Sequence, residues 1–271
     1  MQLAVIGPGT MGLMAAKRLV ETGIAKGSDV RCSRVSAARR QGVAAALPEA
    51  RLLEDNPEAV AGADVVILAV KPKQFADVGR ELQGQLAAGT LVISVMTGIA
   101  LEAMSGLLDA PDVVRASSNI GIESGVSTTY WIGTSALTEA NHKRASAIFK
   151  SWGDSIECGT EGLMDIAMVG VGSGPALVIE FIQAMTQAMV TEGMPRPLAE
   201  QGILSLLAGT AELARTTNRS LSDFQQSVIT PGGITAEALF AMDEGKFRAT
   251  IINAIRRAHR KAAGLGNPEL Q

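Results

Sequence analysis

The chain has 271 residues, 47% of them hydrophobic and 19% charged, so it can bury a sizeable core, and its net charge of −3 gives no reason to expect a nucleic-acid partner. No uninterrupted apolar run approaches the roughly 18 residues of a membrane span, and no basic, cleavable leader begins the chain, so a cytoplasmic protein without a membrane partner is expected. Cys32 and Cys158 form no metal-binding cluster with histidine, so no metal site is expected.

Short apolar segments alternate with amphipathic ones through the first 160 residues. Strands are expected at residues 3–6, 29–32, 64–70, 90–95 and 113–114, and helices at residues 11–21, 35–46 and 75–86. Strands that alternate with helices predict a parallel, doubly wound sheet with helices on both faces. Residues 1–160 are therefore predicted to form one α/β domain.

The pattern becomes helical after residue 160. Helices are expected at residues 175–192, 197–216 and 235–264, separated by Pro195, Pro197 and the turn at residues 230–233. Residues 161–271 are thus predicted to form an all-α domain. About a hundred residues rich in Ala, Met and Leu make a small core, so we expect a second subunit to complete it, which gives a homodimer.

A glycine motif follows the first predicted strand directly. It reads Gly-Pro-Gly-Thr-Met-Gly and matches GxGxxG between a strand and a helix. Gly7 allows the tight turn, Gly9 lets the backbone approach a pyrophosphate, and Gly12 lets helix and strand pack closely. Thr10 and Met11 begin the helix, whose free N–H groups attract phosphate. The motif predicts a Rossmann NAD(P)-binding domain; the alternative is a glycine-rich turn without a ligand.

The end of the second predicted strand decides between the two nicotinamide cofactors. An acidic residue there would bind the ribose 2′-hydroxyl of NADH, but the chain has Ser33 and Arg34, and Asp29 comes too early in the strand. Ser33 and Arg34 could hold a 2′-phosphate through charge-assisted hydrogen bonds, which favours NADPH, with NADH as the alternative. Arg39 and Arg40 are expected on a solvated face.

The strand predicted at residues 64–70 ends at a second candidate contact. Ala69, Val70, Lys71 and Pro72 lie at its carboxyl end, the edge at which open α/β sheets bind ligands. All four are predicted to lie beside the cofactor. Lys71 has two interpretations, a cofactor contact or a solvated lysine at a strand end.

The chain is poor in residues that transfer protons. Residues 151–245 contain no histidine and no lysine, His142 and His259 lie in polar segments expected at the surface, and Tyr130 is expected in the core. A carbonyl reductase needs such a group to protonate the developing alkoxide. An iminium arrives protonated and needs only orientation and hydride. The composition therefore favours reduction of C=N over C=O.

Several linked motifs occur in the order found in one known family. Residues 227–239 read SVITPGGITAEAL, similar to that family's V-[ST]-[ST]-P-G-G-x-T loop. GSGPA at 172–176 is similar to S-G-S-G-P-A, EGKFR at 244–248 to E-x-G-x-F-R, and VVILAVKP at 65–72 to a cofactor-lining strand. Asn56 matches an asparagine near the cofactor. The chain thus resembles pyrroline-5-carboxylate reductase over essentially its whole length.

The resemblance implies reduction of 1-pyrroline-5-carboxylate to proline with NAD(P)H, the last step of proline biosynthesis. It also implies dimers with intertwined C-terminal helices, sometimes assembled into larger homo-oligomers. In the family, N–H groups of the loop hold the substrate carboxylate, and a threonine hydroxyl forms a hydrogen bond with the ring nitrogen. The resemblance gives this threonine role to Thr235, which is the expected catalytic residue. The corresponding substrate-binding residues are Thr230, Gly232, Gly233, Ile234 and Thr235. The alternative is a tight turn between helices with Thr235 as N-cap.

The chain departs from the family around the predicted substrate pocket. Residues 115–121 read RASSNIG instead of the usual run containing M-P-N-T-P, although Asn119 matches its asparagine and is predicted to bind substrate. Met96-Thr97-Gly98 replaces A-A-G, and Leu177 replaces an aromatic residue. The alternatives are therefore a reductase of a different cyclic imine or a catalytically weak NADPH-binding paralogue. A β-hydroxyacid dehydrogenase relative would need a lysine on the first long C-terminal helix, and none occurs there.

Overall fold

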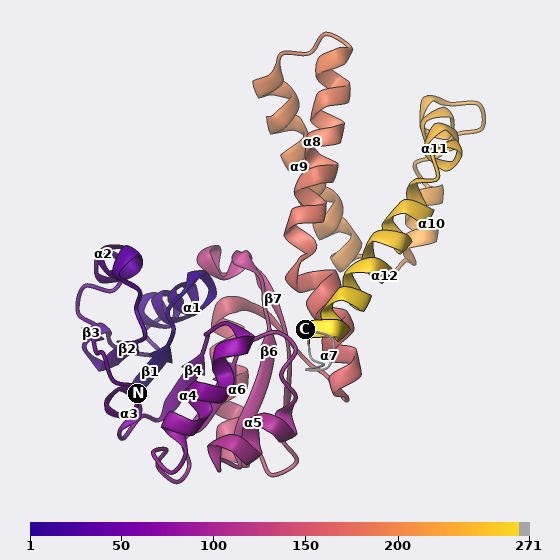
Figure 1. Ribbon diagram of the computed structural model, residues 1–271. Helices are drawn as coiled ribbons and strands as arrows, with labels where there is room; N and C mark the ends of the chain where they lie inside the picture. Colours follow the sequence, from indigo (N-terminus) through magenta and orange to yellow (C-terminus); the bar gives the residue numbers. More distant parts are fainter. Residues whose placement is uncertain (266–271) are drawn as a thin grey trace. The chain divides into compact units, whose positions relative to one another are not determined.

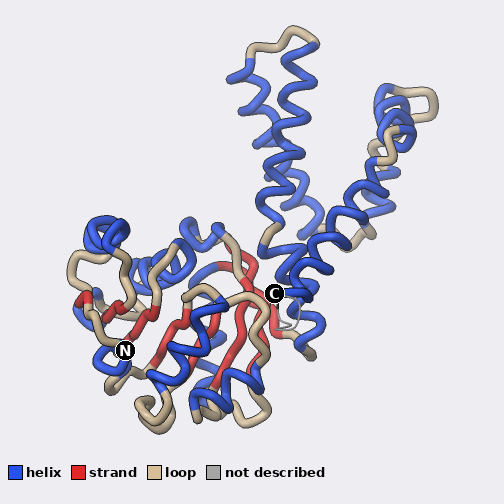
Figure 2. The backbone as a smooth tube through the Cα atoms, viewed as in Figure 1, coloured by secondary structure: helices blue, strands red, loops and turns tan. Residues whose placement is uncertain are grey.

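The computed structural model describes residues 1–265 (Figure 1), which fall into two compact units. Unit 1 contains Met1–Gly174 and the chain from Ala258, and unit 2 contains Pro175–Arg257. Figure 2 shows that the strands all belong to unit 1, whereas unit 2 is helical. The predicted class, an α/β domain followed by an all-α domain, is confirmed.

Unit 1 is built on one sheet of eight strands in the order β3-β2-β1-β4-β5-β6-β7-β8. The strands are β1 (Leu3–Ile6), β2 (Val30–Ser33), β3 (Arg51–Leu52), β4 (Val65–Leu68), β5 (Leu91–Ser94), β6 (Val113–Ser117), β7 (Ser127–Gly133) and β8 (Gly153–Glu157). The first six are parallel, β7 runs antiparallel to β6, and β8 is parallel to β7. The order reverses between β1 and β4, so their carboxyl ends open a crevice of the kind that binds dinucleotides.

Helices cover both faces of this sheet. They are α1 (Thr10–Glu21), α2 (Ala37–Ala46), α3 (Asn56–Val60), α4 (Phe75–Leu82), α5 (Leu101–Leu108), α6 (Glu139–Trp152) and α7 (Glu161–Ala167), with 3₁₀ turns η1 (Gly27–Asp29), η2 (Pro72–Gln74) and η3 (Ile120–Ser124) and a π-helix η4 (Met168–Gly172). Alternate residues of β1 enter different cores: Leu3 and Val5 join one hydrophobic cluster, and Ala4 and Ile6 the other. A strand buried on both faces explains the continuous apolar runs that predicted a parallel sheet.

Unit 2 consists of α8 (Gly174–Thr191), which begins at the unit boundary, α9 (Arg196–Thr216), α10 (Leu221–Gln226), α11 (Ile234–Glu244) and the first part of α12 (Phe247–Leu265). The single helix predicted over residues 235–264 is wrong. It is broken at Gly245 and Lys246, where Lys246 adopts a left-handed φ of 54°. The N-cap of α11 is Gly233 and not Thr235, so the helix begins two residues earlier than an N-cap at Thr235 would allow.

Unit 2 leaves most of its apolar side chains exposed. Among its described residues, only Thr186, Ala199 and Ile203 are buried. Its exposed large apolar residues include Val178, Ile179, Leu198, Leu204, Leu206, Leu213, Phe240 and Ile252. In the described part of the chain, one helical stretch, Glu161–Thr191, is long and apolar enough to cross a membrane by length and composition alone, with a mean hydropathy of 1.6. Helices that pack against another protein pass the same test, and an exposed apolar surface of this kind needs a partner to cover it.

Candidate active site

The turn between β1 and α1 requires glycine at two of its three motif positions. Gly7 has a left-handed φ of 76°, and a Cβ on it would lie 2.6 Å from Cγ1 of Val70. A Cβ on Gly12 would lie 2.7 Å from Cβ of Ala69. Gly9 differs, since a Cβ there would meet nothing nearer than 3.9 Å. Gly7 and Gly12 thus let the turn pack on the end of β4, and Gly9 leaves open space above it.

The N–H groups at the N-terminus of α1, which follows this turn, have no side-chain cap. Its N-cap is Gly9, no side chain caps the first turn, and no acidic residue lies there. The first N–H groups of the helix and its positive dipole end are therefore available to an anion. This arrangement fits the pyrophosphate of a dinucleotide.

A cleft of about 570 Å³ opens beside the turn. It is lined by Gly7, Pro8, Gly9, Arg34, Val35, Ser36, Arg39, Ala69, Val70, Lys71 and Gln74. The structure thus brings together most of the predicted cofactor-binding residues, with Thr10, Met11 and Gly12 in the first turn of α1 and Pro72 at the start of η2. Arg39 was predicted to lie on a solvated face; it is exposed, but it lines this cleft. Arg40 pairs with Glu54 instead.

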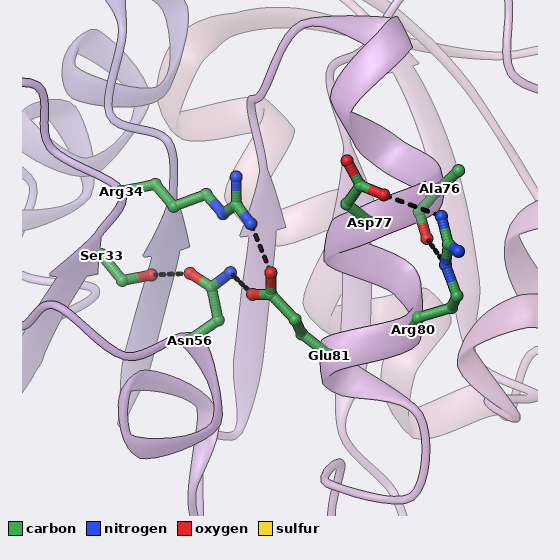
Figure 3. Close-up of polar contacts among 7 residues, drawn as sticks. All are labelled: Ser33, Arg34, Asn56, Ala76, Asp77, Arg80 and Glu81. Atoms are coloured by element: carbon green, nitrogen blue, oxygen red, sulfur yellow. Dashed lines mark hydrogen bonds and ion pairs between the residues drawn. The ribbon is translucent and has the colours of Figure 1, made fainter.

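A hydrogen-bonded chain connects the end of β2 with α3 and α4 (Figure 3). The Ser33 hydroxyl donates to Oδ1 of Asn56 at 2.6 Å, and Nδ2 of Asn56 donates to Oε2 of Glu81 at 2.5 Å. Nη2 of Arg34 donates to the other carboxylate oxygen of Glu81, also at 2.5 Å. The structure therefore brings Ser33, Arg34 and Asn56 together, and their predicted contacts with the cofactor stay predictions. Sequence reasoning missed Glu81, because no local pattern links α4 to a residue 47 positions earlier.

Ser33 and Asn56 form a buried layer below the cleft, with 0% and 2% of their surfaces exposed. Arg34 lies at the cleft itself, and its side chain is 31% exposed. Its φ of 53° is left-handed, which is uncommon for arginine. Of Ser33 and Arg34, only Arg34 lines the cleft. The predicted contact of Ser33 with a 2′-phosphate stays a prediction.

A second cavity, of about 200 Å³, lies at the carboxyl ends of β5 and β6. Its lining residues are Met11, Val95, Met96, Thr97, Arg115, Ala116, Ser117, Ser118, Met164, Met168, Gly172 and Ser173. None of these is a histidine, lysine, tyrosine or carboxylic acid. Met11 stands in the first turn of α1, so this cavity adjoins the glycine turn.

Arg115 supplies the only formal charge among those lining residues, and it is already neutralised. Its side chain is 6% exposed, with Nη1 2.5 Å from Oε1 of Glu161 and Nη2 2.8 Å from Oδ1 of Asp165. Glu161 also accepts from the backbone N–H of Leu101 at 3.0 Å. Arg115 therefore fixes α7 to the sheet beside the cavity, and its charge is not left over for a substrate carboxylate.

The side chain of Asn119 has partners on both of its polar atoms. Oδ1 accepts from the N–H of Gly121 at 2.9 Å, and Nδ2 donates to the carbonyl of Val171 at 3.3 Å. Asn119 is not among the lining residues of the cavity, although Ser117 and Ser118 are. In this structure Asn119 shapes the segment that departs from the family; its predicted role in substrate binding stays a prediction.

The other titratable candidates lie away from both cavities. His142 is exposed on α6 and pairs with Glu157 at 2.9 Å, as expected for a surface histidine. Cys32 and Cys158 are free thiols. Burial raises the pKa of Cys32 to about 12, so it stays a neutral, unreactive thiol at neutral pH. Within residues 1–265, no group of three or more His, Cys, Asp and Glu could hold a metal ion.

The predicted substrate loop forms a tight turn in unit 2. The N–H of Gly233 donates to the carbonyl of Thr230 at 2.9 Å, and Gly232 has a φ of 68°, the pattern of a turn with proline second and glycine third. A Cβ on Gly233 would collide with Oγ1 of Thr230. α11 begins directly after this turn without a side-chain cap, and Thr235 is its second residue. The first N–H groups of α11 therefore have no side-chain cap, and the predicted contact of this loop with a substrate carboxylate stays a prediction.

Comparisons with known proteins agree with this architecture. Residues 161–265 match the family model described as pyrroline-5-carboxylate reductase dimerisation, and residues 2–98 match that described as NADP oxidoreductase, coenzyme F420-dependent. A pyrroline-5-carboxylate reductase from Synechocystis sp. is 32% identical over 98% of both chains.

Two solved structures share the fold over 98% of both chains. One is a pyrroline carboxylate reductase from Plasmodium falciparum solved with NADP bound, with a TM-score of 0.89 and 24% identity. The other is a pyrroline-5-carboxylate reductase from Coxiella burnetii, with a TM-score of 0.86 and 25% identity. With a curated relative above 30% identity along nearly its full length, this chain belongs to the pyrroline-5-carboxylate reductase family.

Proposed function

We propose that this protein reduces 1-pyrroline-5-carboxylate to L-proline, as the names of its relatives suggest, with NADPH as the preferred reductant. A reduced nicotinamide bound at the glycine turn would supply the hydride. The observation that carries the proposal is the cavity beside that turn, whose lining contains no histidine, lysine, tyrosine or carboxylic acid. Such a lining suits a protonated C=N bond, which needs orientation but no side-chain acid.

The roles of the cofactor-binding residues follow from their positions. Gly7, Gly9 and Gly12 let the backbone approach the pyrophosphate, and the N–H groups of the first α1 turn, including Thr10 and Met11, hold its charge. Arg34 binds the 2′-phosphate, above the buried pair of Ser33 and Asn56. Ala69, Val70 and Lys71 line the cleft after the end of β4, and Pro72 follows them at the start of η2.

The substrate-binding residues are proposed to lie on the turn that precedes α11. Its positive-φ Gly232 and crowded Gly233 keep the backbone tight, and the Gly233 N–H is used inside the turn, so the N–H groups of Ile234 and Thr235 are the ones that point out of an uncapped helix end. A carboxylate is the ligand that such an end stabilises. The hydroxyl of Thr235 then holds the ring nitrogen.

Thr235→Ala is expected to lower kcat/KM for the imine about tenfold or more, the scale of one lost polar contact in a site. Thr235→Ser keeps the hydroxyl and should retain most of the activity. The matched control is Thr250→Ala on α12, because the Thr250 hydroxyl bonds only the carbonyl of Lys246 in its own helix turn. Steady-state kinetics with saturating NADPH measures all three. Unchanged kinetics in Thr235→Ala would remove this residue from the site.

A second candidate function is reduction of a different cyclic imine. Met11, Met96, Met164 and Met168 line the cavity with flexible apolar side chains, and methionine adapts to irregular shapes. NADPH oxidation should therefore be followed with 1-pyrroline-5-carboxylate, with other cyclic imines and with 2- and 3-oxoacids. Turnover of oxoacids alone would point to a hydroxyacid dehydrogenase, and cofactor binding without any turnover to an inactive paralogue.

The exposed apolar surface of unit 2 supports a homodimer built from the helical region. We place the working boundary between a cofactor domain and this dimerisation domain after residue 160, at the start of α7. We also propose that the dimers can assemble into larger homo-oligomers. The protein is proposed to be cytoplasmic and to have neither a membrane nor a nucleic-acid partner.

Analytical ultracentrifugation without detergent should give at least twice the 28.1 kDa mass of one chain. The reason is that α8, α9, α11 and α12 cannot cover their apolar residues alone. A stable monomer would contradict the dimer. Recovery only in detergent would indicate that Glu161–Thr191 meets lipid instead of protein.

A further inference from the structure

Glu81 ties together two residues that the proposed function assigns to the cofactor. Its carboxylate is shared: Oε1 accepts from Arg34 and Oε2 accepts from Asn56, each at 2.5 Å (Figure 3). The side chain of Glu81 is 42% exposed, whereas Asn56 is buried. The chain from Ser33 through Asn56 thus ends on a negative charge held against the guanidinium of Arg34.

The position of this carboxylate conflicts with local preference. Glu81 is the second-last residue of α4, where the helix dipole disfavours a negative charge. Arg34 adopts an uncommon left-handed φ of 53° at the end of β2. Both partners of this ion pair thus sit in locally unfavourable positions. This combination points to a functional arrangement more than to an ordinary surface ion pair.

The ion pair of Arg34 and Glu81 also bears on the acidic residue that is missing at the end of β2. NAD-binding Rossmann domains place an acidic residue at the end of the second strand, and this chain has Ser33 and Arg34 there instead. The fold supplies the missing carboxylate from α4. Glu81 does not line the cleft, so it acts on a cofactor through Arg34, which does.

We propose that Glu81 is a positioning residue that sets cofactor preference, by holding Arg34 and competing with the 2′-phosphate of NADPH for its guanidinium. This rests on the proposed dinucleotide function. The dianionic 2′-phosphate must take Arg34 from Glu81 and lie near a second negative charge, which weakens its binding. The 2′-hydroxyl of NADH carries no charge and does not need Arg34. Glu81 therefore reduces the discrimination between the two cofactors and lets the protein use both.

The test compares Glu81→Gln with the unaltered chain by isothermal titration calorimetry against NADPH, NADH, 2′,5′-ADP and 5′-ADP. The variant should bind NADPH and 2′,5′-ADP about three- to tenfold more tightly, the range expected for removing one competing charge at a partly exposed site. Affinity for NADH and 5′-ADP should change less than twofold. Because these ligands report binding alone, the result is independent of which imine is reduced.

Asp77→Asn is the matched control. Asp77 lies on the same helix, its change alters the net charge equally, and among the described residues its ion pair is with Arg80, three positions along the helix, at 2.7 Å (Figure 3). Its effect on the ratio of NADPH to NADH affinity should be negligible. Glu81→Ala, which removes the whole side chain, should shift the ratio in the same direction as Glu81→Gln.

A double-mutant cycle tests whether the effect runs through Arg34. In the background of Arg34→Ala, Glu81→Gln should no longer tighten the binding of 2′,5′-ADP. An unchanged affinity ratio in Glu81→Gln, weaker NADPH binding, or a full effect without Arg34 would each overturn the proposal while leaving the dinucleotide function intact. Failure of the unaltered chain to bind any of the four ligands would overturn both.

Discussion

Gly7→Ala is expected to cost about 2–5 kcal/mol of unfolding free energy and to abolish measurable dinucleotide binding. The first part of the cost is a side chain at a φ of 76°, about 1–2 kcal/mol for a residue other than glycine. The second part is overpacking, about 1–3 kcal/mol, because the new Cβ would lie 2.6 Å from Cγ1 of Val70. Urea denaturation at fixed protein concentration and NADPH titration measure the two effects.

Gly9→Ala separates folding from binding. Its φ of −70° suits alanine and its Cβ would meet nothing within 3.9 Å, so the urea midpoint should stay within the error of the unaltered chain. The methyl group would still occupy the open space above the turn, where the pyrophosphate is proposed to lie. NADPH affinity should therefore fall although stability does not. Equal losses of stability in Gly7→Ala and Gly9→Ala would contradict this account of the turn.

Local chemistry made the first half of the site predictable. The turn from β1 to α1 depends on residues within six positions of one another, and Gly7 and Gly12 have a steric reason that a motif can express. Ala69 and Val70 were predictable because they directly follow β4, a continuous apolar strand that ends at Leu68. Family resemblance added Asn56 and the turn at Gly232 and Gly233, which spacing alone reads as a connection between helices.

Sequence reasoning missed one long-range contact and two features with weak local signals. Glu81 meets Arg34 only because the fold brings the end of α4 within reach of the side chain that follows β2. The antiparallel β7 alternates buried and half-buried residues, which is a weaker signal than the fully buried β4. The break between α11 and α12 depends on Gly245 and a left-handed Lys246 inside a segment that otherwise reads as helix. The Glu81 contact is therefore long-range, whereas the break between α11 and α12 arises from the local backbone of two exposed residues.

The buried charges beside the second cavity should respond asymmetrically to removal. Arg115 is 6% exposed, whereas Glu161 and Asp165 are 34% and 41% exposed. Arg115→Met leaves two carboxylates that water can partly solvate, so the expected loss is about 1–3 kcal/mol. The double change Glu161→Gln and Asp165→Asn leaves a buried guanidinium without a charged partner, and the expected loss is about 3–5 kcal/mol. Removing the acids should therefore cost more than removing the base.

Urea denaturation of a full cycle tests this order. The triple variant that combines Arg115→Met, Glu161→Gln and Asp165→Asn should be more stable than the double acid variant, because no buried charge is then left unpaired. Arg80→Met, which breaks an exposed pair with Asp77, should cost less than about 1 kcal/mol and serves as the control. If the triple variant is the least stable, the ion pairs contribute net stability themselves. If it is the most stable of the altered chains, the pairs are retained because they hold α7 beside the cavity, and activity should then fall even where stability recovers.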